Sequence, residues 1–270
     1  MLLKNKHAVI YGAAGSIGGA VTRAFAREGA TVFITGRTRD KLEKLAHEIN
    51  SAGGKAVVDV VDAMNIKEVN NHLEGVVNNA GKIDISFNAI EIENKQDIAL
   101  TEMSPHDFVS PVEKTMQTHF ITFTAAGRAM MKTGSGVILS LTATPGGVGY
   151  PMVGGFGPAC AALENFSRNL AVELGVHGVR VVNIRSASSP DSRPFKEAMA
   201  AQPEIFKSEI SRMEADTMIK ELPLIADIAN IAVFLASDMA AKITGVTIDA
   251  TVGTTAGLNY RTSERDFTKK

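Results

Sequence analysis

The sequence predicts an α/β protein built on a doubly wound parallel sheet, because short runs rich in β-branched residues alternate with longer segments of helical period. Residues 7–12 ("HAVIYG") are typical of a buried strand, residues 16–30 of a helix with Ile17 and Phe25 on one face, and residues 31–36 of the next strand. Strand, helix and strand repeat in this way along the chain. Such units form a parallel sheet with helices on both faces, since their crossovers are right-handed.

The later elements follow the same alternation. We expect a second helix that ends near Gly53 and Gly54, and further strands at residues 55–61, 136–141 and 178–184. No linker rich in proline or serine and no repeat divides the chain, so we expect one Rossmann-like domain over residues 1–270. Residues 186–222 are polar and rich in methionine, and we predict a helical excursion there, over the active-site end of the sheet.

Composition narrows the classes of partner. The formal net charge of −1 leaves no basic excess to neutralise phosphate backbones, so nucleic acid and anionic membrane surfaces are not expected partners. The single cysteine cannot form an intramolecular disulfide, and no export signal opens the chain, which favours a cytoplasmic location. No apolar run reaches the roughly 18 residues that a membrane span needs. We expect a small-molecule ligand and no metal site.

A glycine-rich loop joins the first strand to the first helix. "YGAAGSIGGA" places Gly12, Gly15 and Gly18 at the position where glycines let a backbone approach a pyrophosphate at a helix N-terminus. The spacing is G-x-x-G-x-x-G rather than the dinucleotide fingerprint G-x-G-x-x-G. A tight turn that requires glycine is the alternative, but the strand–loop–helix context favours a nucleotide site.

With these blocks in view, the whole chain resembles the short-chain dehydrogenase/reductase family. The resemblance runs from residue 6 to about residue 255, through the glycine loop, "DVVD" (59–62), "GKID" (81–84), "RNLAVELGVHGVRV" (168–181) and "ADIANIAVFLASDMAAKITG" (226–245). The family loop usually reads T-G-x-x-x-G-x-G, so Tyr11 replaces the threonine and Ser16 the middle glycine. The resemblance implies an oxidoreductase whose loop residues hold a nicotinamide dinucleotide: Gly12, Gly15, Ser16, Ile17 and Gly18.

The family signature N-N-A-G occurs in the chain at a misleading place. In the family it ends the fourth strand, shortly after a "GkiD" block, whereas residues 78–81 precede "GKID" here. Apolar residues recur at helical spacing from Ile66 to Ala80, which predicts a helix that Gly81 ends. We therefore match the signature to "FNAIE" (87–91), with Asn88 at the first asparagine and Ala89 beside it near the cofactor.

The end of the second strand bears on the choice of cofactor. Gly36 is followed by Arg37, Thr38 and Arg39, where a carboxylate would bind the ribose hydroxyls and repel a 2′-phosphate. The planar donor fork of arginine suits a phosphate, so Arg37 and Thr38 favour NADPH over NADH. The alternative is that the two arginines are solvated loop residues. The resemblance implies that Asp59 faces the adenine, with a helix-capping role as the alternative.

The catalytic positions depart from the family. The resemblance implies a tetrad of Asn, Ser, Tyr and Lys, in which the tyrosine exchanges a proton while the nicotinamide carries the hydride. Aligned from "LAVEL", the tyrosine falls on Phe156, the lysine on Cys160, the serine on Ala143 and the asparagine on Thr115. Enoyl reductases of the superfamily use a tyrosine seven residues before the lysine, and that position is Val153. The standard chemistry is therefore not expected.

Displaced groups could substitute for the tetrad. Tyr150 lies in a glycine-rich loop and is the best candidate for a proton donor, with loop packing as the alternative. No lysine lies nearby on the helix of Cys160 to lower a phenol pKa of about 10. Cys160 itself, among alanines, is more typical of a small apolar residue than of a nucleophile.

Two functions from different classes follow. The first is a divergent NADP(H)-dependent oxidoreductase with an unorthodox proton donor, and the second is a non-catalytic dinucleotide-binding protein, a sensor or scaffold. The fold supports the first, and the replaced tetrad supports the second. We also expect a homo-oligomer, a tetramer or dimer, that associates through the helix at residues 159–174 and the strand near residues 243–253.

Overall fold

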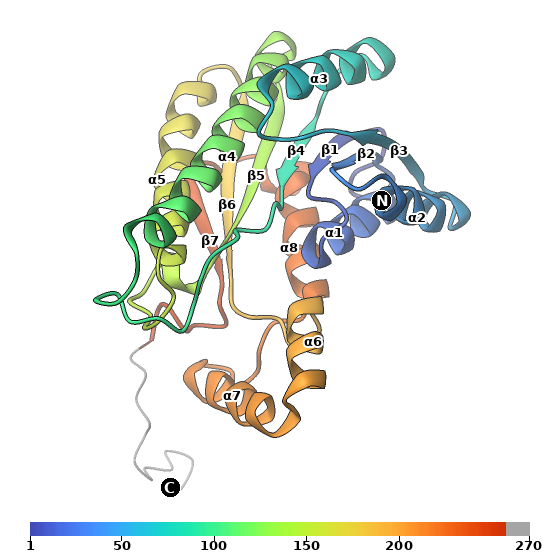
Figure 1. Cartoon of the computed structure of the whole chain (residues 1–270). Helices are drawn as coiled ribbons and strands as arrows, with labels where there is room; N and C mark the ends of the chain where they lie inside the picture. Colours follow the sequence, from blue (N-terminus) through green and yellow to red (C-terminus); the bar gives the residue numbers. More distant parts are fainter. Residues whose placement is uncertain (258–270) are drawn as a thin grey trace, which may run out of the picture.

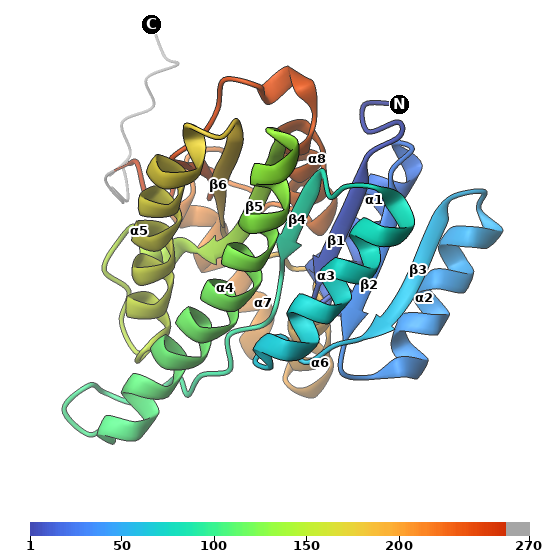
Figure 2. The ribbon, with the colours of Figure 1, turned by 90° about the horizontal axis from the view of Figure 1, so that it is seen from above.

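In the computed structural model, which describes residues 1–257, seven parallel strands form one sheet in the order β3-β2-β1-β4-β5-β6-β7 (Figures 1 and 2). This confirms the predicted α/β fold with a doubly wound sheet. Residues 258–270 of the predicted domain lie outside the described part. The strands are β1 (His7–Tyr11), β2 (Thr31–Gly36), β3 (Lys55–Val60), β4 (Ile85–Asn88), β5 (Gly136–Ala143), β6 (Val179–Ser186) and β7 (Val246–Ala250).

The strand order reverses between β1 and β4, and this switch point places the site. Tyr11, the last residue of β1, pairs in register with Asn88, the last residue of β4. The loops that follow these two strands therefore diverge at the same carboxyl edge. In open parallel sheets the crevice at such a switch point is where ligands bind.

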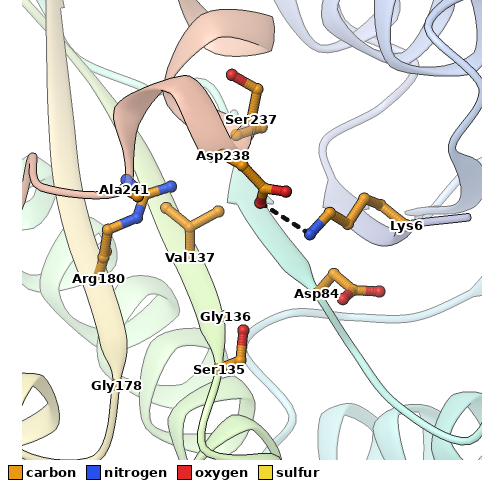
Figure 3. Close-up of a pocket in the computed structure, with 11 residues that line it drawn as sticks. Lys6, Asp84, Ser135, Gly136, Val137, Gly178, Arg180, Ser237, Asp238 and Ala241 are labelled. Atoms are coloured by element: carbon orange, nitrogen blue, oxygen red, sulfur yellow. Dashed lines mark hydrogen bonds and ion pairs between the residues drawn. The ribbon is translucent and has the colours of Figure 1, made fainter. Parts of the chain in front are cut away.

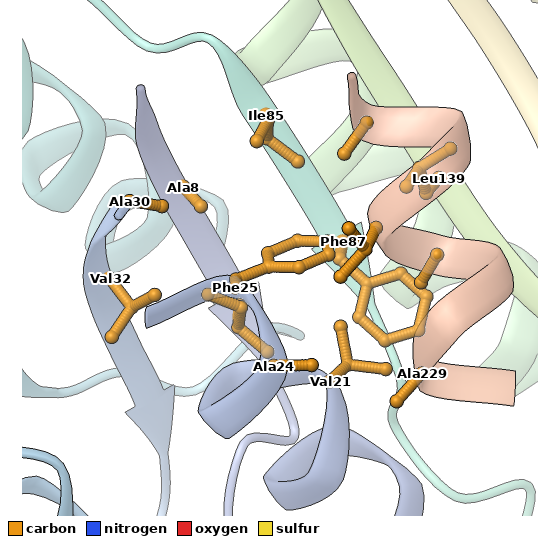
Figure 4. Close-up of a cluster of buried hydrophobic side chains, with 14 of the residues drawn as sticks. Ala8, Val21, Ala24, Phe25, Ala30, Val32, Ile85, Phe87, Leu139 and Ala229 are labelled. Carbon is orange, nitrogen blue, oxygen red and sulfur yellow. The ribbon is translucent and has the colours of Figure 1, made fainter. Parts of the chain in front are cut away.

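Helices cover both faces of the sheet. One hydrophobic cluster packs α1, α2 and α8 on one face, and a second packs α3, α4 and α5 on the other (Figure 2). Figure 4 shows Phe25 of α1, Phe87 of β4 and Ala229 of α8 together in the first cluster. The helices are α1 (Ser16–Arg27), α2 (Arg39–Ser51), α3 (Ile66–Ala80), α4 (Pro105–Thr133), α5 (Phe156–Gly175), α6 (Arg193–Ala201), α7 (Pro203–Asp216) and α8 (Ile225–Ala236), with short 3-10 turns η1 (Thr144–Gly146) and η2 (Asp238–Ala240).

The end of α3 confirms that the N-N-A-G of residues 78–81 is not at a strand end. The helix runs to Ala80, and Gly81 ends it in the left-handed conformation with φ of 82°. Asn65 caps the start of the helix, because its side chain accepts hydrogen bonds from the backbone N–H groups of Lys67 and Glu68. Asn88, which the sequence comparison matches to the signature, is the last residue of β4.

The segment after β6 contains two helices. Figure 1 shows α6 and α7 beyond the carboxyl end of β6, before the chain returns through α8. Asp191 accepts a hydrogen bond from the backbone N–H of Ile225 at 3.0 Å, which links the start of this segment to the start of α8. Within residues 1–257, no helix combines the length and the apolar character needed to cross a bilayer.

Candidate functional site

The loop between β1 and α1 has a geometry that only glycine permits at two positions. Gly12 has φ of +73°, and a Cβ there would lie 2.8 Å from the carbonyl oxygen of Ala89; a Cβ on Gly18 would lie 2.3 Å from the carbonyl oxygen of Gly12. Gly15 donates its backbone N–H to the carbonyl oxygen of Gly12 at 3.0 Å and is the N-cap of α1. The loop thus turns tightly against the end of β4 and leaves the first N–H groups of α1 free of side-chain caps. Free N–H groups at a helix N-terminus suit an anion.

Ser16 and Ile17 have distinct roles in this loop. The hydroxyl oxygen of Ser16 accepts a hydrogen bond from the backbone N–H of Arg193 at 3.0 Å, so it joins the glycine loop to the start of α6. This contact gives the departure from the family's glycine a structural reason. Ile17 packs against the hydrophobic cluster under α1 and fixes the helix on the sheet.

Arg37 and Thr38 are exposed at the carboxyl end of β2. Arg37 forms no ion pair with any of residues 1–257, whereas Arg39, the first residue of α2, pairs with Glu43 at 3.3 Å. The pKa of Glu93 is lowered mainly by its hydrogen bond with Lys114, with a smaller contribution from Arg37. Arg37 therefore lies near the loop after β4 with its guanidinium available.

Asn88 is fully buried, and its side chain is already engaged. Its amide nitrogen donates to the Thr122 hydroxyl of α4 at 3.0 Å, and its amide oxygen accepts from the backbone N–H of Ile90 at 3.0 Å. Ala89 donates its N–H to the carbonyl of Tyr11 at 3.0 Å. Asn88 thus fixes the backbone beside Gly12, and the structure brings Gly12 and Ala89 together.

The four positions matched to the family tetrad lie on β5, α5 and α4. Ala143 ends β5, Phe156 begins α5 and Cys160 follows one turn later. The Cys160 thiol is buried against the backbone of Ala143, and burial raises its pKa to about 11, so it is not a thiolate at neutral pH. Gly155 packs so closely on α4 that a Cβ would lie 2.0 Å from the carbonyl of Phe108. The start of α5 is thereby held against α4.

Thr115 and His119 form one buried turn of α4. The His119 Nδ1–H donates to the backbone carbonyl of Thr115 at 2.8 Å, since a carbonyl only accepts. The Thr115 hydroxyl and the His119 Nε2 have no hydrogen-bond partner among residues 1–257. Burial lowers the pKa of His119 to about 4, against a smaller opposing effect of the Thr115 carbonyl, so the imidazole is neutral near pH 7. A neutral, enclosed imidazole is not a ready proton donor.

Tyr150 lies in the loop between η1 and α5 and is 39% exposed. The pKa of Arg212 on α7 is raised mainly by its hydrogen bond with Glu209, and Tyr150 adds a smaller effect of the same sign. The phenol therefore lies near α7. No described contact joins it to Ala143, Phe156 or Cys160.

A charged network lies next to the tetrad positions, and the sequence did not predict it. Arg185 of β6 donates to Glu164 of α5 at 2.9 Å and to Asp249 of β7 at 3.2 Å. Glu164 also accepts from the Thr142 hydroxyl at 2.8 Å. The hydrogen bond to Glu164 raises the pKa of Arg185. The available signal is Glu164 itself, a carboxylate one turn after Cys160 in an otherwise apolar helix stripe.

A hollow of about 160 Å³ lies at the opposite, amino end of the strands (Figure 3). Its charged groups are already paired: Lys6 meets Asp238 at 3.1 Å, and Asp84 meets Lys82 at 2.8 Å. Arg180 donates to the carbonyl of Leu235 at 2.7 Å, near the end of α8. This hollow is lined by residues at the amino ends of the strands and at the end of α8, and no residue of the glycine loop lines it. Residues 1–257 contain no cluster of three or more metal-binding side chains.

Comparison with known proteins places the chain among oxidoreductases. The profile of the family described as enoyl-(acyl carrier protein) reductase matches residues 12–255. A short chain aldehyde dehydrogenase 1 of Euphorbia lathyris is 30% identical over 253 residues, covering 91% of this chain and 86% of that protein.

Two solved structures share the fold. NAD⁺-bound xylitol dehydrogenase is 21% identical, with a TM-score of 0.84 over 92% of this chain and 98% of that one. Actinorhodin polyketide ketoreductase with NADPH is 20% identical, with a TM-score of 0.83 over 93% and 98%. The chain belongs to the short-chain dehydrogenase/reductase family of NAD(P)-dependent oxidoreductases.

Proposed function

We propose that this protein binds NADP(H) at the carboxyl end of β1, β2 and β4, and that it does not carry out carbonyl reduction by the family's usual proton transfer. The observation that carries the cofactor half is the glycine loop, where a Cβ on Gly12 or Gly18 would collide with backbone. That cradle fits a pyrophosphate, because backbone N–H groups approach it without side chains between.

The residues around the loop divide the cofactor among them. The backbone of residues 12–18 and Ala89 would hold the pyrophosphate and the adjoining ribose, Arg37 and Thr38 a 2′-phosphate, and Asp59 the adenine. Similar folds bind either NAD⁺ or NADPH, so the side chains after β2 make the selection. When bound, the nicotinamide supplies hydride transfer.

The other half of the site offers little for the accompanying proton. Reduction of a carbonyl develops negative charge on oxygen, and removal of one oriented donor typically costs about 10² to 10³ in rate. Ala143 and Phe156 carry no side-chain donor, and the Cys160 thiol is buried. Cys160 also replaces the lysine that would tune a phenol. The positions offered for a tetrad (Thr115, Ala143, Phe156 and Cys160) therefore favour binding without ordinary turnover.

A displaced proton donor is the second candidate function, and Tyr150 is the residue that favours it. It is a phenol on the loop that leads into α5, and its exposure leaves it free to reach a ligand. In that case Tyr150→Phe would abolish whatever turnover the protein has, while cofactor affinity would stay unchanged.

Calorimetric titration of NADPH and NADH tests the cofactor proposal. We expect tighter binding of NADPH, and Arg37→Ala should lower NADPH affinity about tenfold while NADH affinity stays the same, since a charge-assisted hydrogen bond to phosphate is lost. Arg39→Ala is the matched control, because Arg39 pairs with Glu43 on α2 and should change neither affinity by more than about twofold. Equal affinities in the wild type, or an effect of Arg37→Ala on both cofactors, would refute the phosphate role.

We further propose that the protein self-associates through α5 and β7. Apolar side chains are exposed on both elements, Val172 on α5 and Val246 on β7 among them. Contiguous exposed apolar surface is typical of association sites, and in this proposal the two side chains belong to such a surface. Sedimentation of the wild type should show a dimer or tetramer, and Val172→Glu should shift it toward the 28.6 kDa monomer. A wild type that sediments only as a monomer contradicts this proposal.

A further inference from the structure

A carboxylate, an imidazole and a phenol meet between β3, α3 and β1. The Nε2 of His72 on α3 lies 3.4 Å from the Oδ2 of Asp59 on β3. The ring of Tyr11, at the end of β1, meets the His72 ring edge-on, with centroids 6.4 Å apart. The side chain of His72 is only 5% exposed, whereas that of Asp59 is 47% exposed. The imidazole is therefore enclosed and the carboxylate opens to solvent.

The partners of these groups show why the pair is informative. The two ring nitrogens of His72 form no hydrogen bond of good geometry with any of residues 1–257. The same holds for the Tyr11 hydroxyl. Burial lowers the pKa of His72, and Asp59 opposes that shift. The imidazole is thus neutral at neutral pH and has one N–H to donate. At 3.4 Å its contact with Asp59 is longer than a normal hydrogen bond and can shorten when a ligand completes the site.

Asp59 places the pair of His72 and Asp59 at the edge of the sheet where the cofactor is proposed to bind. Asp59 pairs in register with Thr35, one residue before β2 ends, so it lies at the same edge of the sheet as Arg37. If the cofactor is bound as proposed, its adenosine half lies along this edge. An ionised carboxylate only accepts hydrogen bonds, so it can bind the amino group of adenine but not the carbonyl oxygen at the same position of hypoxanthine.

We propose that His72 is a positioning residue that holds the Asp59 carboxylate toward the amino group of the adenine, so that α3 takes part in base recognition. The inference rests on the proposed binding of NADP(H). His72 touches no ligand itself: it fixes one oxygen of Asp59 and leaves the other for the base. Tyr11, which stands in place of the family's threonine, packs its ring edge-on against the imidazole from β1.

A comparison of the affinities for an adenine and a hypoxanthine dinucleotide tests this proposal. Affinities of NADPH and of reduced nicotinamide hypoxanthine dinucleotide phosphate are measured by calorimetry for the wild type and variants. The wild type should prefer the adenine form by about tenfold, as expected for one hydrogen bond to a charged group. His72→Leu should reduce that preference to about twofold, and His72→Gln, which keeps an N–H donor, should restore part of it.

Two further variants separate the possible outcomes. Arg37→Ala should weaken NADPH binding and leave the base preference as in the wild type. Asp59→Asn should abolish the base preference. Because Asp59 is half-exposed, this second variant gives a result even if His72→Leu fails to fold. A wild-type base preference in folded His72→Leu, or no preference in the wild type, overturns the role of His72 while the cofactor proposal stands. A wild type that binds neither dinucleotide refutes the proposed function and this inference together.

Discussion

The glycine loop (residues 12–18) and the α5 start (Phe156 and Cys160, taken together with Ala143 at the end of β5) lie at the same edge of one sheet but differ in what would carry their chemistry. The glycine loop relies on backbone, and its close approaches leave no room for a Cβ at Gly12 or Gly18. The α5 start would rely on side chains, and those present are apolar or buried. Backbone geometry survives substitution of neighbouring side chains, whereas an acid–base group is lost with a single substitution. A chain can therefore keep a cofactor site after its proton-transfer site has changed.

The largest effect is expected in the glycine loop. The Cβ that Gly18→Ala adds would lie only 2.3 Å from the carbonyl oxygen of Gly12, so the loop must open. Overpacking of this kind costs about 1 to 3 kcal/mol, and we expect NADPH affinity to fall roughly 100-fold with a lower free energy of unfolding. Calorimetry and denaturant unfolding measure the two.

A second glycine supplies the control for that variant. Gly75 lies within α3, and a Cβ there would meet nothing within 4 Å. Gly75→Ala should leave NADPH affinity unchanged and stabilise the protein by about 0.5 kcal/mol. If Gly18→Ala binds NADPH as the wild type does, the loop is a structural turn and the comparison between the two regions fails.

The next effect concerns stability and not cofactor affinity, and it is expected at His119 of α4, which lies one turn from Thr115 and reports on burial. Its folded pKa of about 4 lies below the unfolded value of about 6.5, so its neutral form stabilises the fold above pH 6.5, and this stability is lost as the pH falls through 4. Between pH 7 and pH 4 the loss is about 3 kcal/mol. Urea unfolding at both values should show a flatter pH dependence for His119→Gln.

Exposed His177 provides the comparison for that measurement. His177→Gln removes a histidine from the surface, so its unfolding should follow the wild type at both pH values. If His119→Gln and the wild type lose the same free energy on acidification, His119 is solvated. The region around Thr115 would then be open enough to hold the water that a proton relay needs.

Local pattern predicted most of the fold. The helical period from Ile66 to Ala80 and Gly81 after it identified α3 and removed the misleading N-N-A-G signature, because a helix end is encoded by neighbouring residues. Glycine spacing likewise located the loop that packs on Ala89.

Contacts between distant segments were beyond the sequence. The bond from Arg193 to Ser16 joins residues 177 positions apart, and the pair of Arg185 and Glu164 joins strand β6 to helix α5. Asn88 was expected at the end of β4 and lies there, but its side chain forms hydrogen bonds with Thr122 and with the backbone of Ile90, which the sequence did not indicate. A single sequence gives spacing along an element, and it does not give which side chains of two elements meet.

Turnover by the wild-type protein tests the central claim most directly. NADPH oxidation is followed by absorbance with saturating cofactor and a panel of simple ketones and aldehydes. The same assay on the variant combining Thr115→Asn, Ala143→Ser, Phe156→Tyr and Cys160→Lys shows that the panel can report activity. We predict oxidation at background rate for the wild type and a rise well above it for the combined variant. Efficient oxidation of NADPH by the wild type with any member of the panel would contradict the account.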